Sequence, residues 1–262
     1  MGGLASLGSY KVELDAGFLR DKFILGSSLL GGTDTLGGST SYFDVTEYVT
    51  NVSINRGRDS QDAQFGASTC TITIDDLKAQ DKFSVANTAS PYWNAERGRL
   101  GFEPRRKIRI SRDSEYLFVG FITNYDTTFE IDGHNMIQIA GVDAFFLLTT
   151  TTISTFTPPA EKSGARVDRI LGLPEIDFPD DPLPVIATGV ANLASLEVTA
   201  QTPLSYFNRI IETAEQGRLY VDRSGRLTWE ARTPKATNAA VSLTFADDGT
   251  GIPYSTLEVI YE

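Results

Sequence analysis

Strict alternation of apolar and polar side chains marks two segments of the chain. Val52 and Ile54 alternate with serine and asparagine, and Cys70, Ile72 and Ile74 alternate with threonines. A period of two is typical of a strand that turns one face toward a core. Because a polar loop joins the two segments, the pattern predicts an antiparallel hairpin, with one face in a core and the other toward water or a partner.

Further segments with the same alternation extend over about residues 8–150. We expect a strand at Tyr10 to Leu14, others within FDVTEYVTNVSINRGR and RRKIRISRD, and three or four more from EYLFVGFITNYDTTFE and HNMIQIAGVDAFFLL. Short strands at regular spacing predict an all-β barrel or sandwich. The irregular stretch around Phe83 and Pro91 is expected to be a packed loop that covers one end of the barrel.

The periodicity changes after the threonine- and proline-rich linker TTTTISTFTPP. Ser163 is a candidate N-cap of a short helix that ends at Gly172. A second helix is predicted with Thr202 as its cap, Pro203 at its first position and Gly217 as its stop. These helices place a small α+β module after the barrel.

A hairpin completes this module, and the chain then returns to strand character. RLYVDRSGRLTWEAR predicts a turn at Asp222 to Gly225 between two short strands. The final residues read as a strand without a partner, so we expect the chain to be cut inside a domain. The expected organisation is an N-terminal strand and glycine-rich arm at 1–41, a barrel at 42–150, the module at 160–235 and the start of a second barrel at 236–262.

Composition and charge narrow the classes of ligand. The chain has 262 residues, 41% of them hydrophobic, and a formal net charge of −11. Nucleic acids and anionic membranes are bound mainly through lysine and arginine, so this charge argues against both. Cys70 is the only cysteine, which fits a reducing compartment. The sequence predicts neither a signal peptide nor a membrane-spanning segment.

No catalytic constellation is evident, and we expect no enzyme, no cofactor and no metal site. The only histidine, His134, lies in a predicted turn and with one cysteine cannot complete a zinc site. Three groups of carboxylates lie beside glycine, proline or strand ends, where aspartate is favoured as a turn residue, so a structural role is preferred to catalysis. Calcium binding by Asp177, Asp180 and Asp181 is an alternative, but their spacing does not match an EF-hand loop. The groups are Asp75 with Asp76; Asp177, Asp180 and Asp181; and Asp247 with Asp248.

Two further segments have a structural interpretation. The glycine-rich stretch from Gly26 to Gly38 lacks the Gly-Lys-Ser/Thr ending of a phosphate-binding loop, so a surface loop or arm is preferred. A local basic cluster has no interleaved aromatic residues, which favours one half of a charged subunit interface over a nucleic-acid site. Its members are Arg97, Arg99, Arg105, Arg106, Lys107 and Arg109.

Several sequence segments, taken in order, resemble those of a known family. From about Tyr42 to Glu262 the chain contains, in this order, the segments FDVTEYVTNVSINRGR, FGASTCTITIDD, SPYW with RRKIRI, LFVGFITNY, IAGVDAFFLL, VDRIL, AEQGRLYVDRSGRLTW and IPYSTLEVIYE. Together they resemble the minor tail proteins of long-tailed phages, and more specifically the hub-type proteins at the tail tip, which are similar to contractile-phage baseplate hubs. The glycine-rich segment before Tyr42 has no place in this pattern.

The resemblance implies a structural role in the virion, after synthesis in the cytoplasm of a bacterial host. Antiparallel barrels like those of tail-tube proteins would form a ring around the DNA channel, as a homotrimer rather than a hexamer. The ring would join the tail tube to the distal apparatus for host-cell attachment. Its partners would be further copies of itself and the tube, distal tail and tape-measure proteins, with DNA passing an acidic lumen without specific binding.

Candidate interface residues come from the resemblance and from the basic cluster. The hairpin with Arg56 and Arg58 would be an inter-subunit element whose polar loop reaches a neighbour. The candidate subunit interface comprises Arg56, Arg58, Arg97, Arg99, Arg105 and Arg106. The alternative function is a carbohydrate-binding β-sandwich for host-surface recognition, which would need Tyr92 and Trp93 as exposed rings. A cell-wall hydrolase would instead need paired carboxylates such as Asp180 and Asp181.

Overall fold

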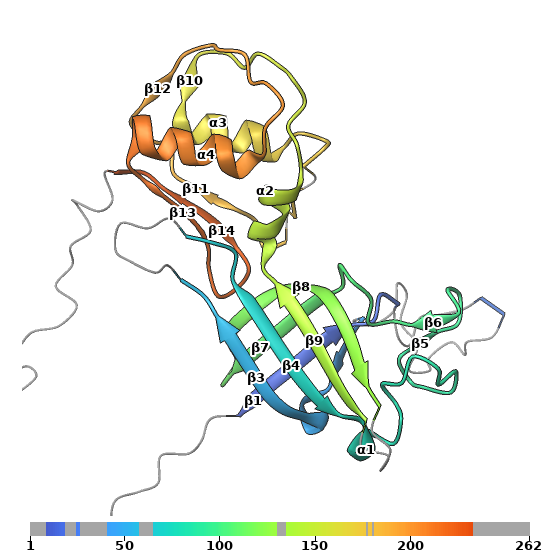
Figure 1. Ribbon diagram of the computed structural model, residues 1–262. Helices are drawn as coiled ribbons and strands as arrows, with labels where there is room; N and C mark the ends of the chain where they lie inside the picture. Colours follow the sequence, from blue (N-terminus) through green and yellow to red (C-terminus); the bar gives the residue numbers. More distant parts are fainter. Residues whose placement is uncertain are drawn as a thin grey trace, which may run out of the picture.

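A seven-stranded antiparallel sheet is the largest sheet of the protein (Figure 1). The computed structural model describes residues 9–18, 25–26, 41–57, 65–129, 135–176, 178–179 and 181–232. Outside these ranges lie most of the glycine-rich arm, Arg58, His134, Asp177, Asp180, Asp247, Asp248 and the predicted second barrel. The predictions for those residues stay predictions.

The strand order of the large sheet is β2-β1-β7-β8-β9-β4-β3. The 14-residue strand β8 pairs with β7 through its first half and with β9 through its second half, so it joins two hairpins into one curved sheet. The prediction of a mainly antiparallel β fold is confirmed. The strands are β1 (Tyr10–Asp15), β2 (Tyr42–Asp44), β3 (Val49–Asn55), β4 (Thr69–Asp75), β7 (Lys107–Arg112), β8 (Glu115–Thr128) and β9 (Met136–Val142).

The alternating pattern of the sequence fixes which face of this sheet is buried. β3 and β4 pair antiparallel, with Val52 opposite Ile72, as the hairpin prediction required. Ile72 and Ile74 have no exposed surface, and β9 continues the layer with Ile137 and Ile139, which are likewise fully buried. Removing such side chains from water supplies the main favourable free energy of folding.

The irregular segment after β4 packs aromatic rings against this core, as predicted. Phe83 is fully buried, and its ring centroid lies 4.9 Å from that of Tyr92 and 5.9 Å from that of Phe102. Phe43 of β2 meets Tyr92 edge to face at 5.1 Å. The short elements around this cluster are η1 (Thr46–Tyr48), α1 (Asp76–Ala79), β5 (Trp93–Asn94) and β6 (Arg99–Leu100).

Residues from Ala144 onward build a second hydrophobic cluster, in which helices cover a small sheet (Figure 1). The small sheet has the order β11-β14-β13, and Leu219 pairs with Trp229 and Val221 with Leu227, as the hairpin prediction required. The elements are η2 (Ala144–Phe146), α2 (Leu147–Thr150), β10 (Glu161–Lys162), α3 (Ser163–Leu171), β11 (Val185–Ile186), β12 (Asn192–Leu193), α4 (Pro203–Ile210), the π-helical η3 (Ile211–Glu215), β13 (Arg218–Val221) and β14 (Leu227–Glu230).

Two details of the sequence prediction are wrong. EYLFVGFITNYDTTFE and HNMIQIAGVDAFFLL contribute two strands, because β8 runs unbroken and the Phe-rich end forms η2 and α2. Ser163 does not cap α3: it lies inside the helix, and its hydroxyl donates to the buried Glu215 carboxylate at 2.6 Å. Thr202 does act as a cap, since its hydroxyl accepts from the N–H of Ser205 at 3.3 Å.

Buried polar groups tie the loops of the module together. Arg166, 1% exposed, donates to Glu161 at 2.7 Å, to the Tyr206 hydroxyl at 2.6 Å and to the carbonyl of Pro159 at 2.7 Å. Glu215, fully buried, accepts from main-chain N–H groups and from Ser163. These bonds satisfy charges that would be costly to bury alone.

Candidate assembly surface

The strand β3 forms one edge of the large sheet. It pairs with β4 on one side, and no strand within the described ranges pairs with its other side. Its sequence, VTNVSIN, carries no charge and no proline, the features by which proteins usually protect exposed edges from pairing with another chain. β3 is therefore the part of the sheet best suited to accept a strand from another subunit.

The outward face next to this edge is polar and uncharged. Asn51, Ser53 and Asn55 of β3 are exposed, and Ser53 lies opposite Thr71 of β4. Thr71 in turn lies opposite Ala140 of β9. Small hydroxyl and amide groups offer hydrogen bonds but give a phosphate no cation to bind.

The described ends of the β3–β4 loop lie at the junction between the large sheet and the module. Arg56 donates to the carbonyl of Leu117 in β8 at 2.9 Å. Partial burial and then the neighbouring Arg223 guanidinium lower the pKa of Arg56. The ring of Phe65 lies 5.3 Å from the ring of Tyr220 in β13. Whether residues 58–64 reach a neighbouring subunit stays a prediction.

A cavity of about 210 Å³ lies at this junction, lined by Arg56, Phe65, Ser68, Arg218, Tyr220 and Glu230 among others. Tyr220 donates its hydroxyl to Glu230 at 2.8 Å. Burial, together with that carboxylate, raises the pKa of Tyr220 to about 12, so the phenol stays neutral. Sequence patterns did not indicate this site, because its residues come from two hairpins far apart along the chain.

The other predicted interface arginines lie elsewhere, around β5 and β6. Arg97 and Arg99 both contact one carboxylate oxygen of Glu103, at 3.2 and 3.0 Å. Arg105 is exposed and has a positive φ of 73°. The Arg106 guanidinium packs against Gly17, where a Cβ would overlap it. Figure 1 shows β5 and β6 far from the module, so Arg97 and Arg99 do not share one patch with Arg56, which lies beside the module.

The remaining candidate residues have structural contacts. Tyr92 is only 5% exposed, so it cannot offer its ring to a sugar beside Trp93. Asp76 is fully buried and accepts from the N–H of Phe83 at 3.0 Å, and burial raises its pKa. Asp181 is exposed near Lys107, with 4.0 Å between the charged atoms.

Two other kinds of feature are absent from the described part of the chain. Within the described ranges, no group of three or more histidine, cysteine, aspartate or glutamate side chains is arranged to hold a metal ion. In the same part of the chain, no helix has the length and apolar character needed to cross a membrane.

Comparisons with known proteins identify no family by sequence. No family model matches the chain, and no curated protein matches it. Among solved structures, the 43 kDa tail protein of prophage MuSo2 from Shewanella oneidensis aligns at 10% identity and a TM-score of 0.49, over 85% of this chain and 54% of that one.

Two other solved structures align similarly. A tail protein from Neisseria meningitidis MC58 aligns at 10% identity and a TM-score of 0.49, over 84% of this chain and 50% of that one. A PdpA–VgrG complex aligns at 12% identity and a TM-score of 0.41, over 92% of this chain and 39% of that one. The chain thus spans about half the length of the two tail proteins. TM-scores below 0.5 do not establish a shared fold.

Proposed function

We propose that this chain is a structural component of a phage tail tip, where copies form a ring around the DNA channel. The ring joins the tail tube to the distal apparatus that meets the host. The observation that carries the proposal is the uncharged edge of β3, which pairs with no further strand of the described ranges, because a ring of barrels needs an edge that accepts a neighbouring subunit. The sequence segments that resemble hub-type tail proteins support placing this assembly at a phage tail tip.

The charge of the protein supports the passage of DNA without binding. The net charge is −11, and the face beside the β3 edge carries hydroxyl and amide groups. A channel lined by such a surface repels DNA phosphates or offers them no cation to bind, so the genome does not adhere as it passes. The basic side chains Arg97 and Arg99 are already engaged by Glu103.

The test combines electron cryo-microscopy of intact particles with a charged edge variant. We expect density for this chain in a ring of three-fold or six-fold symmetry around an open channel. Ser53→Lys with Asn55→Lys places charges on the β3 edge and should prevent assembly, while Gln138→Lys places one on the exposed face of the inner strand β9 and should not.

Each outcome has a clear meaning. Circular dichroism and the unfolding midpoint verify that the variants fold. A peripheral position of the chain, away from any ring, would exclude the proposed role. Normal ring assembly by the double lysine variant would exclude β3 as the interface while leaving the ring itself in place.

A further inference from the structure

In the part of the chain that the structure describes, the outer edge of the small sheet at β11 carries main-chain groups without a partner. The N–H of Ala187 donates to the carbonyl of Trp229 in β14 at 3.0 Å, and β11 pairs with β14 in parallel. Main-chain groups alternate in direction along a strand, so the N–H and C=O of Ile186 point away from β14. No group in the described part of the chain bonds to them. An edge of this kind can accept an added strand.

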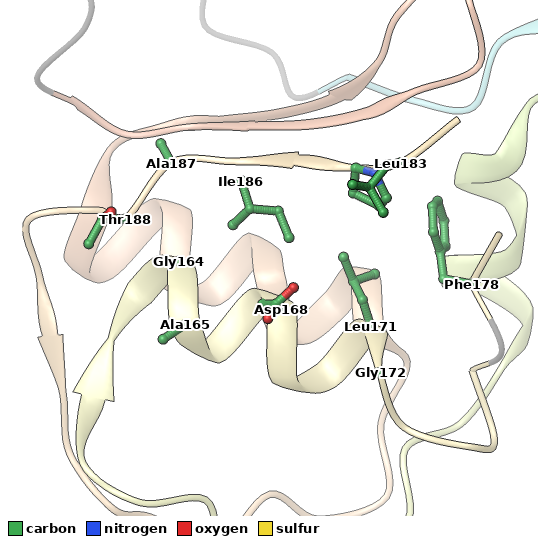
Figure 2. A pocket seen from close by; sticks show the side chains of 11 residues that line it. Gly164, Ala165, Asp168, Leu171, Gly172, Phe178, Leu183, Ile186, Ala187 and Thr188 are labelled. Atoms are coloured by element: carbon green, nitrogen blue, oxygen red, sulfur yellow. The ribbon is translucent and has the colours of Figure 1, made fainter. Parts of the chain in front are cut away.

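A groove of about 610 Å³ lies directly beside this edge, between β11 and α3 (Figure 2). Its lining includes Leu171 and Asp168 of α3, Ile186 of β11, and Phe178. Gly164 allows α3 to approach the strand closely, since a Cβ there would overlap the carbonyl oxygen of Ala187. The groove thus has walls of mixed polar and apolar character and a close main-chain edge.

Asp168 gives the groove its charge. Figure 2 shows it between Ala165 and Leu171 along α3, with Ile186 on the neighbouring strand. Asp168 is exposed, and no salt bridge or side-chain hydrogen bond joins it to another residue in the described ranges. A lysine or arginine on a bound segment would complement it.

Exposed apolar side chains flank the same edge. Leu183 is 69% exposed and Val185 is 47% exposed, although both belong to the segment that forms β11. Contact with apolar side chains of a partner would remove this surface from water. The chemistry of the groove therefore selects an extended segment with a basic residue between apolar residues.

We propose that β11 and α3 form a docking groove for an extended segment of another protein. The segment adds a strand to β11 by bonding to the main chain of Ile186, and places a lysine or arginine against Asp168. A different protein is the better source than a second copy, because this chain has 34 acidic against 23 basic residues. The inference does not depend on the ring, since it concerns another surface.

The experiment selects binders from a random peptide library, using the full chain as bait. Three baits are compared: the native chain, Asp168→Lys, and Glu115→Lys as the control, which changes an exposed carboxylate on the large sheet. We expect the native chain and the control to enrich lysine or arginine between apolar residues. Asp168→Lys should enrich acidic residues instead, and should bind the native consensus peptide about tenfold more weakly.

A second measurement tests the added strand separately from the charge. The consensus peptide is resynthesised as two variants, one with N-methyl groups on its odd residues and one with them on its even residues. In one of these two frames the peptide cannot donate to the Ile186 carbonyl. One frame should lose binding and the other should keep it. Failure to select a basic and apolar consensus, equal binding by Asp168→Lys, or equal binding in both N-methylated frames would each overturn the proposal.

Discussion

Replacing Glu215 tests how far one buried carboxylate organises the α+β module. Its Oε2 accepts from the Ser163 hydroxyl at 2.6 Å and from the N–H of Ala191 at 3.0 Å. Its Oε1 accepts from the N–H of Val190 at 3.0 Å and from that of Arg232 at 3.4 Å. The carboxylate therefore joins α3, the loop after β11 and the segment after β14.

The expected loss of stability follows from these bonds. A hydrogen bond to a charged group contributes about 1.5–3 kcal/mol, and the contributions of neighbouring bonds do not add fully. Glu215→Gln keeps one acceptor oxygen but turns an NH₂ group toward N–H donors, so we expect a loss of about 3 kcal/mol. Glu215→Ala leaves all the donors without an acceptor, and we expect a loss of about 4–5 kcal/mol.

Urea unfolding followed by tryptophan fluorescence is the assay. The chain has two tryptophans, and Trp229 is 1% exposed within the cluster of the module. A Trp93→Phe background leaves Trp229 as the only emitter, so the signal reports on the module. Glu197→Gln, at an exposed position, is the matched control and should change the free energy of unfolding by less than about 0.5 kcal/mol.

The pH dependence gives an independent check. Burial alone would raise the pKa of Glu215, but the hydrogen bonds from Ser163, Ala191, Val190 and Arg232 outweigh it and lower the pKa below 4.5. Its contribution is therefore present above the pKa of the unfolded carboxyl and is lost as the pH falls through the folded value. The gap between the native chain and Glu215→Gln should narrow below about pH 4.5. Equal stability of Glu215→Gln, or a gap that is constant with pH, would refute the reasoning.

Three other variants or measurements follow from contacts in the two clusters. Arg166→Ala should cost about 3 kcal/mol of unfolding free energy in the same urea assay, because it removes the buried guanidinium that bonds to the Tyr206 hydroxyl and the Pro159 carbonyl, while Glu161 keeps its ion pair with Arg169. Gly120→Ala should lower the thermal midpoint, since a Cβ there would overlap the carbonyl oxygen of Val142, whereas Gly66→Ala meets open space and should not. Cys70 should resist thiol reagents at pH 8 until the protein unfolds, because burial raises its pKa to about 12; rapid labelling of the folded chain would contradict this.

Local patterns predicted the hairpins because each depends on neighbouring residues. The alternation around Ile72 gave the pairing of β3 with β4, and Leu219 and Trp229 gave that of β13 with β14. Thr202 was identified as a cap because capping involves residues three apart. Such signals are contained in a short window of sequence.

Contacts between distant segments could not be predicted in this way. Ser163 resembles an N-cap locally, but its hydroxyl donates to Glu215, 52 positions away. The separation of the predicted arginines could not be predicted for the same reason. Arg56 follows β3, whereas Arg97 and Arg99 belong to the separate β5–β6 hairpin. The docking groove depends on a parallel pairing of β11 with β14, which no short pattern encodes.

β8 is contacted both by the residue that follows β3 and by the module, which has a mechanical consequence. Arg56 bonds to the carbonyl of Leu117, and Gly225 at the tip of the β13–β14 turn sits where a Cβ would lie 2.9 Å from Val119. β8 is held by β7 on one side and by β9 on the other, over successive halves. The module therefore bears on the half of β8 that pairs with β7, so a force that displaces the module acts on that hairpin of the large sheet.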